Sequence, residues 1–431
     1  MIASQSTSNR RPVLGCIADD VTGATDLAIN LVQGGMKVVQ VLGVPTPEQL
    51  KGIDSDAVVV ALKSRSIPSE QAIKLSLDSL ASMQSLGIER IFFKYCSTFD
   101  STPEGNIGPV AEALMNALSV PQTIFCPAFP RNGRSVYQGH LFVGDRLLSE
   151  SGMQDHPLNP MTDSDLARVL SQQCRVPVGK LTFQDYSGDL SEKLSQLRDS
   201  NAPFVITDAC DDFHLQQLSD AVCEMQLVTG GSGIGRYLPE AYRRSGLLTS
   251  ESFSPSLPPM DGRGLIVAGS CSRATQQQVE WMRSRSASRA IDIADLMKDA
   301  KQLQSDLVEW AVGTPEEQPV MLYSTATPEQ VGSWQKEFGV AVLAEAIEDL
   351  LSEVTHELVQ THDFRKLVLA GGETSGAIVK RLEIESLEIG PEICAGVPWT
   401  VSSGPRPLCL ALKSGNFGDV EFFDSALRML A

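Results

Sequence analysis

The sequence predicts an α/β protein made of two three-layer α/β/α domains, and three observations favour this fold. Short apolar runs alternate with amphipathic helical stretches, which is typical of parallel sheets covered by helices on both faces. The chain of 431 residues is too long for one ordinary hydrophobic core. Residues 247–262 are rich in Ser, Pro and Gly and lack apolar periodicity, so we interpret them as a linker between residues 12–246 and residues 263–431.

The composition is typical of a globular protein, with 42% hydrophobic and 20% charged residues. No apolar stretch approaches the roughly 20 residues that a helix needs to cross a bilayer, and residues 1–11 are expected to form a disordered leader, not a signal peptide. The nine cysteines lack metal-ligand spacing, which favours free thiols and a cytoplasmic location. The formal charge of −18 argues against nucleic acid or an anionic membrane as a partner.

The first domain is expected to begin with a buried strand over residues 13–18, followed by a helix whose apolar face includes Leu27 and Leu31. Several of the strands that follow end in polar or small residues, as expected where a ligand site forms at the carboxyl edge of a parallel sheet. Further strands are predicted at residues 38–41, 57–62, 90–94, 123–128 and 204–208, and helices at residues 69–85 and 107–118.

Three acids lie close together after the first strand. Asp19 and Asp20 follow the strand directly, Thr22 or Gly23 can open the helix, and Asp26 would then project from its first turn. Three carboxylates this close repel one another unless a metal, a hydroxyl-rich ligand or cations share the site. In the alternative interpretation, Asp19 or Asp20 simply caps the helix, but one cap accounts for one acid and not for three.

Cations follow two other strands of this domain. Lys63 and Arg65 flank serines and suit a carboxylate or hydroxyl-rich ligand, although a solvated turn explains them equally well. Lys94 ends the next strand and would supply positive charge to the site. Asp100 can bind hydroxyls or a metal, and Asn106 can cap the following helix.

The loop after residues 123–128 carries Arg131 and Arg134, and paired guanidinium groups bind carboxylates well because each can bond bidentately. His140 follows as a reserve base, since a lone histidine is more often structural than catalytic. Residues 229–235 form a glycine-rich loop without a dinucleotide register. It could hold an anion or form a tight turn.

In the second domain, three loops rich in glycine or serine follow predicted strands: residues 269–275, 370–376 and 413–418. The glycines would let backbone approach a ligand, and Thr374 or Ser375 would cap a helix that faces phosphate. We therefore predict a nucleotide phosphate site. The chain has no Walker A motif, no protein-kinase catalytic loop, no H-E-x-x-H and no G-x-S-x-G. Strands are predicted here at residues 265–268, 290–293, 320–324, 367–370, 400–402 and 408–412, and helices ending at Met282 and Leu382.

From residue 13 onward the chain resembles the four-carbon acid sugar kinase family. The resemblance rests on the order and spacing of residues 18–26, 106–109, 371–376 and 413–418. It implies an N-terminal domain that binds a sugar acid, a C-terminal domain that binds ATP, and an active-site cleft between them. It also implies ATP contacts from the loops of the second domain, at Ser270, Ser272, Gly371, Gly372, Glu373, Thr374 and Gly415.

Residues 93–105 indicate the subfamily. Many threonate or erythronate kinases have Lys-x-Asp-Ser-Thr-Leu-Arg-Gly here, whereas this chain lacks the arginine and is similar to the 3-oxo-tetronate kinases. We therefore expect transfer of the ATP γ-phosphoryl group to the O4 hydroxyl of a 3-oxo four-carbon acid, with Mg²⁺ on the ATP phosphates. Closure of the two domains about the linker would exclude water. The expected partners are this sugar acid and ATP, and a homodimer is also considered.

In this hypothesis Asp20, or otherwise Asp19, accepts the hydroxyl proton, and Lys94, Arg131 and Arg134 hold the carboxylate or the phosphate charge. A threonate or erythronate kinase and a non-catalytic sugar-acid sensor are the alternatives. An aspartyl phosphatase is disfavoured because that chemistry needs D-x-D, and Val21-Thr22 follows Asp20 here.

Overall fold

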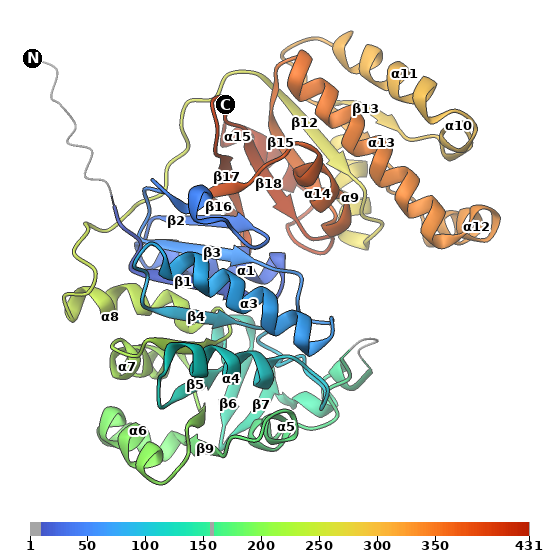
Figure 1. Cartoon of the computed structure of the whole chain (residues 1–431). Coiled ribbons are helices and arrows are strands. Elements are labelled where there is room, and N and C mark those ends of the chain that lie inside the picture. Colours follow the sequence, from blue (N-terminus) through green and yellow to red (C-terminus); the bar gives the residue numbers. More distant parts are fainter. Residues whose placement is uncertain (1–9, 156–158, 431) are drawn as a thin grey trace, which may run out of the picture. The chain divides into compact units, whose positions relative to one another are not determined.

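The computed structural model describes residues 10–155 and 159–430. It divides into two compact units, Met1–Ser254 and Pro255–Ala431, and each is described by itself (Figure 1). Of the predicted leader, residues 1–11, the first nine residues lie outside the described part of the chain. Arg10 is held by an ion pair with Asp56 at 2.5 Å, so the chain from Arg10 on is anchored to the first unit.

The first unit is built on a sheet in which eight parallel strands are described, in the order β2-β3-β1-β4-β11-β5-β10-β9. The central strands are fully buried and rich in Val, Ile and Phe, as expected for a sheet covered on both faces. The strands are β1 (Leu14–Ala18), β2 (Val38–Leu42), β3 (Ala57–Ala61), β4 (Ile91–Lys94), β5 (Thr123–Cys126), β9 (Val178–Leu181), β10 (Phe204–Thr207) and β11 (Leu227–Gly230).

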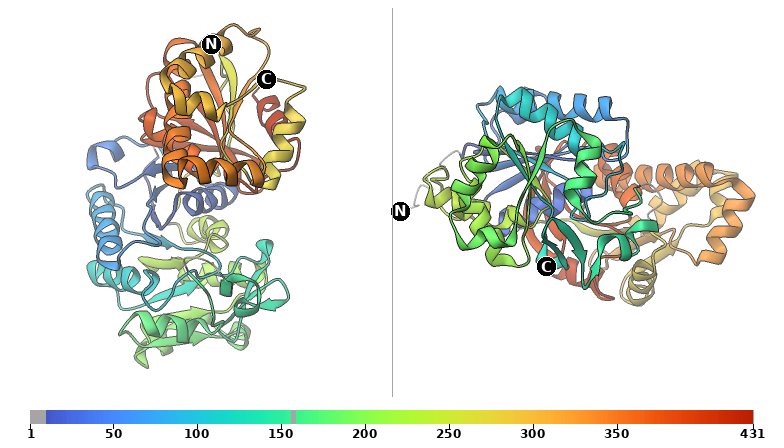
Figure 2. Two further views of the ribbon diagram at one scale, coloured as in Figure 1. Left: turned by 90° about the vertical axis from the view of Figure 1, so that its right-hand side faces the viewer. Right: turned by 90° about the horizontal axis from the view of Figure 1, so that it is seen from below.

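Helices cover both faces of this sheet, which Figure 2 shows edge-on in its right-hand view. Helices α3 (Ser69–Gln84), α4 (Ile107–Leu118) and α5 (Leu166–Gln173) pack next to one another on one face. The other group contains α1 (Val21–Gln33), α6 (Leu190–Asp199), α7 (Asp212–Val222) and α8 (Leu238–Arg244). Short helical segments are α2 (Pro47–Leu50), η1 (Pro130–Asn132), η2 (Leu148–Glu150), η3 (Met153–Asp155), η4 (Phe183–Ser187) and η5 (Ile234–Arg236).

A small antiparallel sheet that the sequence did not predict extends from the carboxyl edge of the first unit. It consists of β6 (Arg134–Tyr137), β7 (His140–Val143) and β8 (Arg146–Leu147). A bridge between Val136 and Ala209 ties it to the segment after β10.

The second unit has a sheet whose described strands run in the order β13-β14-β12-β15-β18-β17-β16. The first five are parallel, and β18-β17-β16 pair antiparallel. The strands are β12 (Arg263–Ala268), β13 (Ala287–Ala290), β14 (Val320–Tyr323), β15 (Phe364–Ala370), β16 (Ser386–Cys394), β17 (Val397–Ser402) and β18 (Cys409–Lys413).

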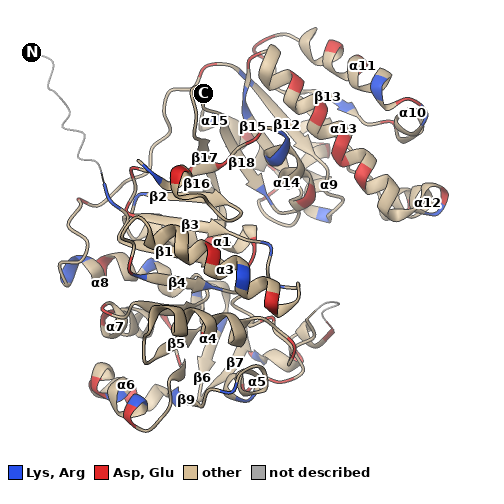
Figure 3. Cartoon of the chain, in the orientation of Figure 1, with Lys and Arg blue, Asp and Glu red and all other residues tan. Residues whose placement is uncertain are grey.

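Helices flank this second sheet as well. Helix α9 (Arg273–Met282) packs against α15 (Phe422–Arg428), and the core beneath them contains the fully buried Trp399. A separate group packs around the long helix α13 and contains α10 (Ile293–Lys298), α11 (Ala300–Val312), α12 (Pro328–Phe338), α13 (Val340–Thr361) and α14 (Gly372–Arg381). Figure 3 shows acidic residues, coloured red, along α13.

The expected strand over residues 290–293 is wrong. The strand β13 is Ala287–Ala290, and Asp292 then caps α10 by accepting a hydrogen bond from the Asp295 N–H at 3.0 Å. The cysteines are all within the described residues and all carry free thiols. Across residues 10–155 and 159–430, no helix is both long and apolar enough to span a bilayer.

Candidate functional site

The carboxyl ends of the central strands in the first unit meet at one edge of the sheet. Ala18, the last residue of β1, lies opposite Ala61 of β3 on one side and Lys94 of β4 on the other. Lys94 in turn lies opposite Gly230 of β11. The segments that follow β1, β3 and β4 therefore come together, and they carry most of the charged residues selected from the sequence.

Asp19 and Arg65 form a bidentate ion pair at this edge. The Arg65 Nε and a terminal guanidinium nitrogen each donate to one Asp19 carboxylate oxygen at 2.8 Å. The Asp19 side chain is 7% exposed and the Arg65 side chain 23%. Burial raises the pKa of Asp19, and the Arg65 hydrogen bonds and charge oppose that rise. Asp19 therefore holds Arg65 in place, and both of its carboxylate oxygens already accept hydrogen bonds.

Asp20 is the more accessible carboxylate, with a side chain 27% exposed. One of its oxygens pairs with Arg65, and the other accepts the Gly23 N–H, so that Asp20 caps α1. Helix α1 thus begins at Val21, and the expectation that Thr22 or Gly23 opens it is wrong. Asp26 consequently lies in the second turn and not in the first. Asp20 therefore does cap the helix, as in the alternative interpretation, and it also pairs with Arg65.

Lys94 is 3% exposed and donates to the Tyr95 carbonyl at 2.7 Å. Its ammonium lies beside the start of α1, because a β-carbon placed on Gly23 would be 3.0 Å from both the Lys94 Nζ and an Asp20 carboxylate oxygen. Burial raises the pKa of Asp26, and Lys94 opposes this more strongly than any other charge. Lys94 and Arg134 are thus the cations that act on Asp26.

Asn106 does not cap α4 with its side chain, contrary to expectation. Its amide nitrogen instead donates to the carbonyls of Ser64, Arg65 and Ile67 at 2.7, 3.2 and 2.9 Å. These bonds fix the backbone of the loop that carries Arg65. Asn106 is therefore a support for the charged edge, which local sequence reasoning missed.

Two further residues selected from the sequence differ in exposure: Lys63 lies at the surface and Asp100 is buried. Lys63 is exposed, as in the solvated-turn alternative. Asp100 is 8% exposed, and its Oδ1 has no hydrogen-bond partner within the described part of the chain. The pKa of the Cys96 thiol is raised to about 11, first by burial and second by the negative charge of Asp100.

Arg131 and Arg134 do not act as a pair. Arg131 is exposed and donates to Asp212 at 2.7 Å, whereas Arg134 is half-buried and donates to the Asn132 carbonyl. Of these two arginines, Arg134 is the one whose charge lowers the pKa of Asp26 within the described residues.

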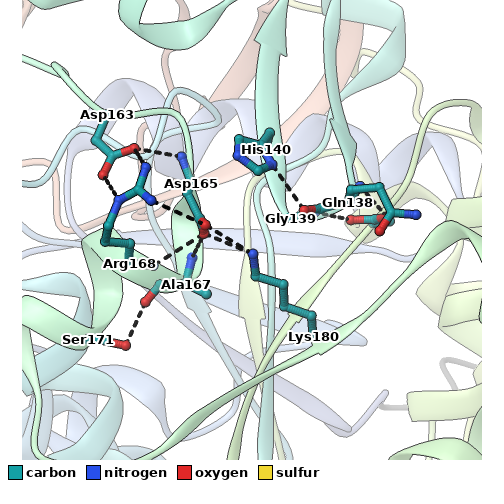
Figure 4. Close-up of polar contacts among 10 residues, drawn as sticks. Gln138, Gly139, His140, Asp163, Asp165, Ala167, Arg168, Ser171 and Lys180 are labelled. Atoms are coloured by element: carbon teal, nitrogen blue, oxygen red, sulfur yellow. Dashed lines mark hydrogen bonds and ion pairs between the residues drawn. The ribbon is translucent and has the colours of Figure 1, made fainter.

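His140 lies in a separate polar cluster, shown in Figure 4, with Asp163, Asp165 and Lys180 around it. Its Nδ1 is 3.0 Å from the Gln138 carbonyl oxygen. Lys180 pairs with Asp165 at 3.0 Å. No contact of His140 with Asp19, Asp20 or Asp26 is found in the described residues.

Sequence reasoning missed Asp208, which follows β10 at the same edge and is 1% exposed. Its carboxylate accepts the backbone N–H groups of Gln138, Gly139 and Phe183 at 2.6, 2.8 and 2.8 Å. Its position directly after a predicted strand could have identified it as a residue of this edge. It anchors the turn between β6 and β7 to the main sheet.

The glycines of the loop after β11 fit the tight-turn alternative. A β-carbon on Gly230 would lie 2.5 Å from the carbonyl oxygen of Cys126 at the end of β5, and one on Gly233 would lie 2.5 Å from that of Ala128, so these positions need glycine for close backbone packing.

In the second unit, the three predicted glycine or serine loops converge. A β-carbon on Gly415 would lie 2.5 Å from the Ser270 Oγ and 3.0 Å from the Ser272 Oγ. One on Gly371, whose φ is 127°, would lie 3.1 Å from the Ser270 N and 3.3 Å from the Thr374 Oγ1. Backbone from all three loops therefore lies within a few ångströms.

Helix α14 begins at Gly372 with Gly371 as its cap, and within the described residues no side chain caps it. The expected caps, Thr374 and Ser375, lie inside the helix, and the Ser375 hydroxyl donates to the Leu369 carbonyl at 3.3 Å. The amides of the first turn, including those of Gly372 and Glu373, are left for an anion.

Comparison with known proteins covers both units. Residues 14–238 match the family described as the sugar-binding N-terminal domain, and residues 265–423 match the nucleotide-binding C-terminal domain. A 3-oxo-tetronate kinase from Pseudomonas fluorescens is 47% identical over 428 residues, which cover 98% of each chain. A 3-oxo-tetronate kinase from Burkholderia multivorans is 47% identical over 428 residues, or 99% of each chain.

Two solved structures are also similar over nearly the full chain. A Salmonella typhimurium LT2 protein that carries a provisional tRNA synthase label has a TM-score of 0.89 and 40% identity, covering 96% of this chain and 98% of that one. A Haemophilus influenzae protein has a TM-score of 0.87 and 38% identity, covering 97% and 100%. The chain therefore belongs to the four-carbon acid sugar kinase family, with a sugar-binding domain followed by a nucleotide-binding domain.

Proposed function

We propose that this chain is a kinase that transfers the γ-phosphoryl group of ATP to the O4 hydroxyl of 3-oxo-tetronate. The observation that carries the proposal is the 47% identity to 3-oxo-tetronate kinases over 98% of the chain. The charged edge of the first unit and the loops of the second supply groups suited to this chemistry. Phosphoryl transfer of this kind needs positioning and charge neutralisation more than covalent chemistry.

The sugar acid would bind at the carboxyl edge of β1, β3 and β4. Lys94 and the exposed part of Arg65 suit the substrate carboxylate or the developing phosphate charge, and both are already held by protein contacts. Asp20 is the better candidate than Asp19 for accepting the O4 proton, because Asp19 is bound bidentately by Arg65 and buried. Asp26, close to Lys94 and Arg134, suits the substrate hydroxyls.

ATP would bind where the loops of Ser270, Gly371 and Gly415 converge, with its phosphates on the free amides at the start of α14. Within residues 10–155 and 159–430, no group of three or more His, Cys, Asp or Glu residues forms a metal site. Proteins commonly bind Mg²⁺ through one or two carboxylates and the substrate phosphates. Mg²⁺ would neutralise the charge of the ATP phosphates.

Transfer requires that the γ-phosphoryl group and the O4 hydroxyl meet where water is excluded during turnover. A cytoplasmic location and a homodimer are parts of the same proposal. Sedimentation of the purified chain tests the dimer, and a tagged chain in intact and fractionated cells tests the location.

The proposal is tested by ADP release with 3-oxo-tetronate, threonate and erythronate as acceptors, and by identification of the phosphorylated product. Transfer to O4 of 3-oxo-tetronate with the highest kcat/KM supports it. A preference for threonate or erythronate would assign the chain to the alternative kinase. Tight binding of a sugar acid without ATP turnover would favour the alternative in which the chain is a non-catalytic sugar-acid sensor.

A pair of lysine variants locates the acceptor site. Lys94→Met removes the buried ammonium beside Asp20, and we expect a large loss of kcat/KM for the sugar acid with an unchanged KM for ATP. Lys74→Met is the matched control, because Lys74 lies on α3 with a side chain 75% exposed. Equal activity of the two variants would contradict the placement of the site.

A further inference from the structure

One buried cation in the second unit has no role in the function proposed above. Lys413 ends β18 and is 1% exposed. Its Nζ donates to the carbonyls of Gly415 and Ser414 at 2.9 and 3.2 Å and to the Thr275 hydroxyl at 3.1 Å. Within the described residues no carboxylate forms an ion pair with it. Its hydrogens are satisfied, but its charge is not compensated.

One of these acceptors, the Gly415 carbonyl oxygen, is held by several donors at once. The Gly415 carbonyl accepts three hydrogen bonds: from the Lys413 Nζ at 2.9 Å, from the Ser272 hydroxyl at 2.5 Å and from the Thr275 hydroxyl at 2.9 Å. Thr275 is fully buried, so this carbonyl points into the protein.

The direction of this carbonyl sets the direction of the next amide. In a planar trans peptide the C=O and the following N–H point in opposite directions. The Gly415 carbonyl faces inward, so the Asn416 N–H faces outward. Asn416 is exposed, and no acceptor for its N–H lies within the described residues. Gly415 also lies against Ser270, where the three loops converge.

We propose that Lys413 is a positioning residue of the nucleotide site, which holds the Gly415 carbonyl inward so that the Asn416 N–H can bind a phosphate oxygen. The polyphosphate would also supply the negative charge that Lys413 lacks. This inference rests on the proposed ATP site. It adds Lys413 to that site and explains why the Gly415 carbonyl is held by three hydrogen bonds. The ammonium acts through the Gly415 peptide and does not need to touch the nucleotide.

Titration offers a second readout. Burial lowers the pKa of Lys413 to about 8. The groups that act on it are the Cys394 thiol, whose own pKa Glu392 and Asp419 raise, and the Phe422 ring, whose centre is 5.9 Å from Nζ. A bound polyphosphate favours the ammonium form and so raises this pKa. ATP affinity is therefore expected to fall as the pH rises through about 8.

The test is calorimetric binding of ATP, ADP and AMP to the full chain and to Lys413→Met, with Lys380→Met, an exposed site on α14, as the matched control. Loss of a charged hydrogen bond predicts about 10- to 100-fold weaker ATP and ADP binding. AMP binding should change less. The KM for the sugar acid should not change, and the pH dependence near 8 should flatten.

Thr275→Val provides a second variant, since it removes one of the three donors but keeps the ammonium, and it should weaken ATP binding by a smaller factor. If Lys413→Met binds ATP within twofold of the wild type, the inference is overturned. If the wild type binds ATP with this dependence on Lys413 but transfers no phosphate, the proposed function fails and the inference stands. If the wild type binds no ATP, both fail.

Discussion

Replacement of Arg65 by Leu tests the physical basis of the charged edge. The change leaves the Asp19 carboxylate, 7% exposed, without the two 2.8 Å hydrogen bonds that hold it. Removing one partner of a buried ion pair costs about 3–5 kcal/mol. Because the Arg65 side chain is 23% exposed, water can partly replace it, so we expect a loss of about 3 kcal/mol in the free energy of unfolding of the first unit at pH 8.

The loss should depend on pH with a definite sign. The pKa of Asp19 is already raised above 3.8 by burial, and removal of Arg65 raises it further. The folded state then binds more protons than the unfolded state above pH 3.8, so stability falls as the pH rises from there to the folded pKa. The difference between wild type and variant should therefore be smallest in acid and constant at high pH.

Urea unfolding can be followed separately in the two units. Tyrosine circular dichroism reports mainly on the first unit and tryptophan fluorescence on the second. The first unit holds Tyr95, Tyr137, Tyr186, Tyr237 and Tyr242, and the second holds Trp281, Trp310, Trp334 and Trp399. Arg65→Leu should move only the tyrosine transition. Adding Asp19→Asn should recover most of the loss. A loss below about 1 kcal/mol, or one independent of pH, would refute the reasoning.

The remaining predictions concern catalysis, both ligands and stability. Asp20→Asn should lower kcat by about 100-fold or more with little change in ATP affinity, measured by ADP release. Gly371→Ala strains a φ of 127° and should weaken ATP binding in calorimetry, whereas Gly332→Ala, with open space around it, should not. Asn106→Ala frees the loop of Arg65 and should raise the KM for the sugar acid. Stability should rise with pH between about 8 and 10.5 because the unfolded chain binds more protons at Lys413, and urea unfolding of Lys413→Met should lack this rise.

Three of these predictions have contrary outcomes as follows. An unchanged kcat in Asp20→Asn would remove it from the mechanism. Equal ATP affinities of the two glycine variants would place the phosphates elsewhere. An unchanged KM for Asn106→Ala would show that the three carbonyl bonds do not support the substrate site.

The central strands and their charged ends could be predicted from the sequence because each is a local pattern. The run from Ala57 to Leu62 is apolar throughout and is followed by Lys63, and such a run in a parallel sheet is buried on both faces. Strand β13 was misplaced because Ala287–Ala290 lacks an apolar run and lies at the edge of its sheet, where pairing with β14 defines it.

Roles that depend on distant partners could not be read locally. The carbonyls bound by Asn106 lie 39 to 42 residues away in the sequence, and the Thr275 hydroxyl lies 138 residues from Lys413. Capping by Asp19 or Asp20 was the alternative interpretation of the sequence. Asp20 does cap α1 and also pairs with Arg65, and its role in catalysis stays a prediction. The pairing of Arg131 with Asp212, by contrast, needed the fold.

The most direct test of the proposed function is phosphorus NMR of the product formed from ATP and 3-oxo-tetronate by the wild-type chain, with Asp20→Asn in parallel. A phosphate ester coupled to the C4 protons, formed with one ADP per ester and nearly absent with the variant, is the predicted result. ATP hydrolysis to free phosphate without an ester, or an ester formed equally well by Asp20→Asn, would contradict the account.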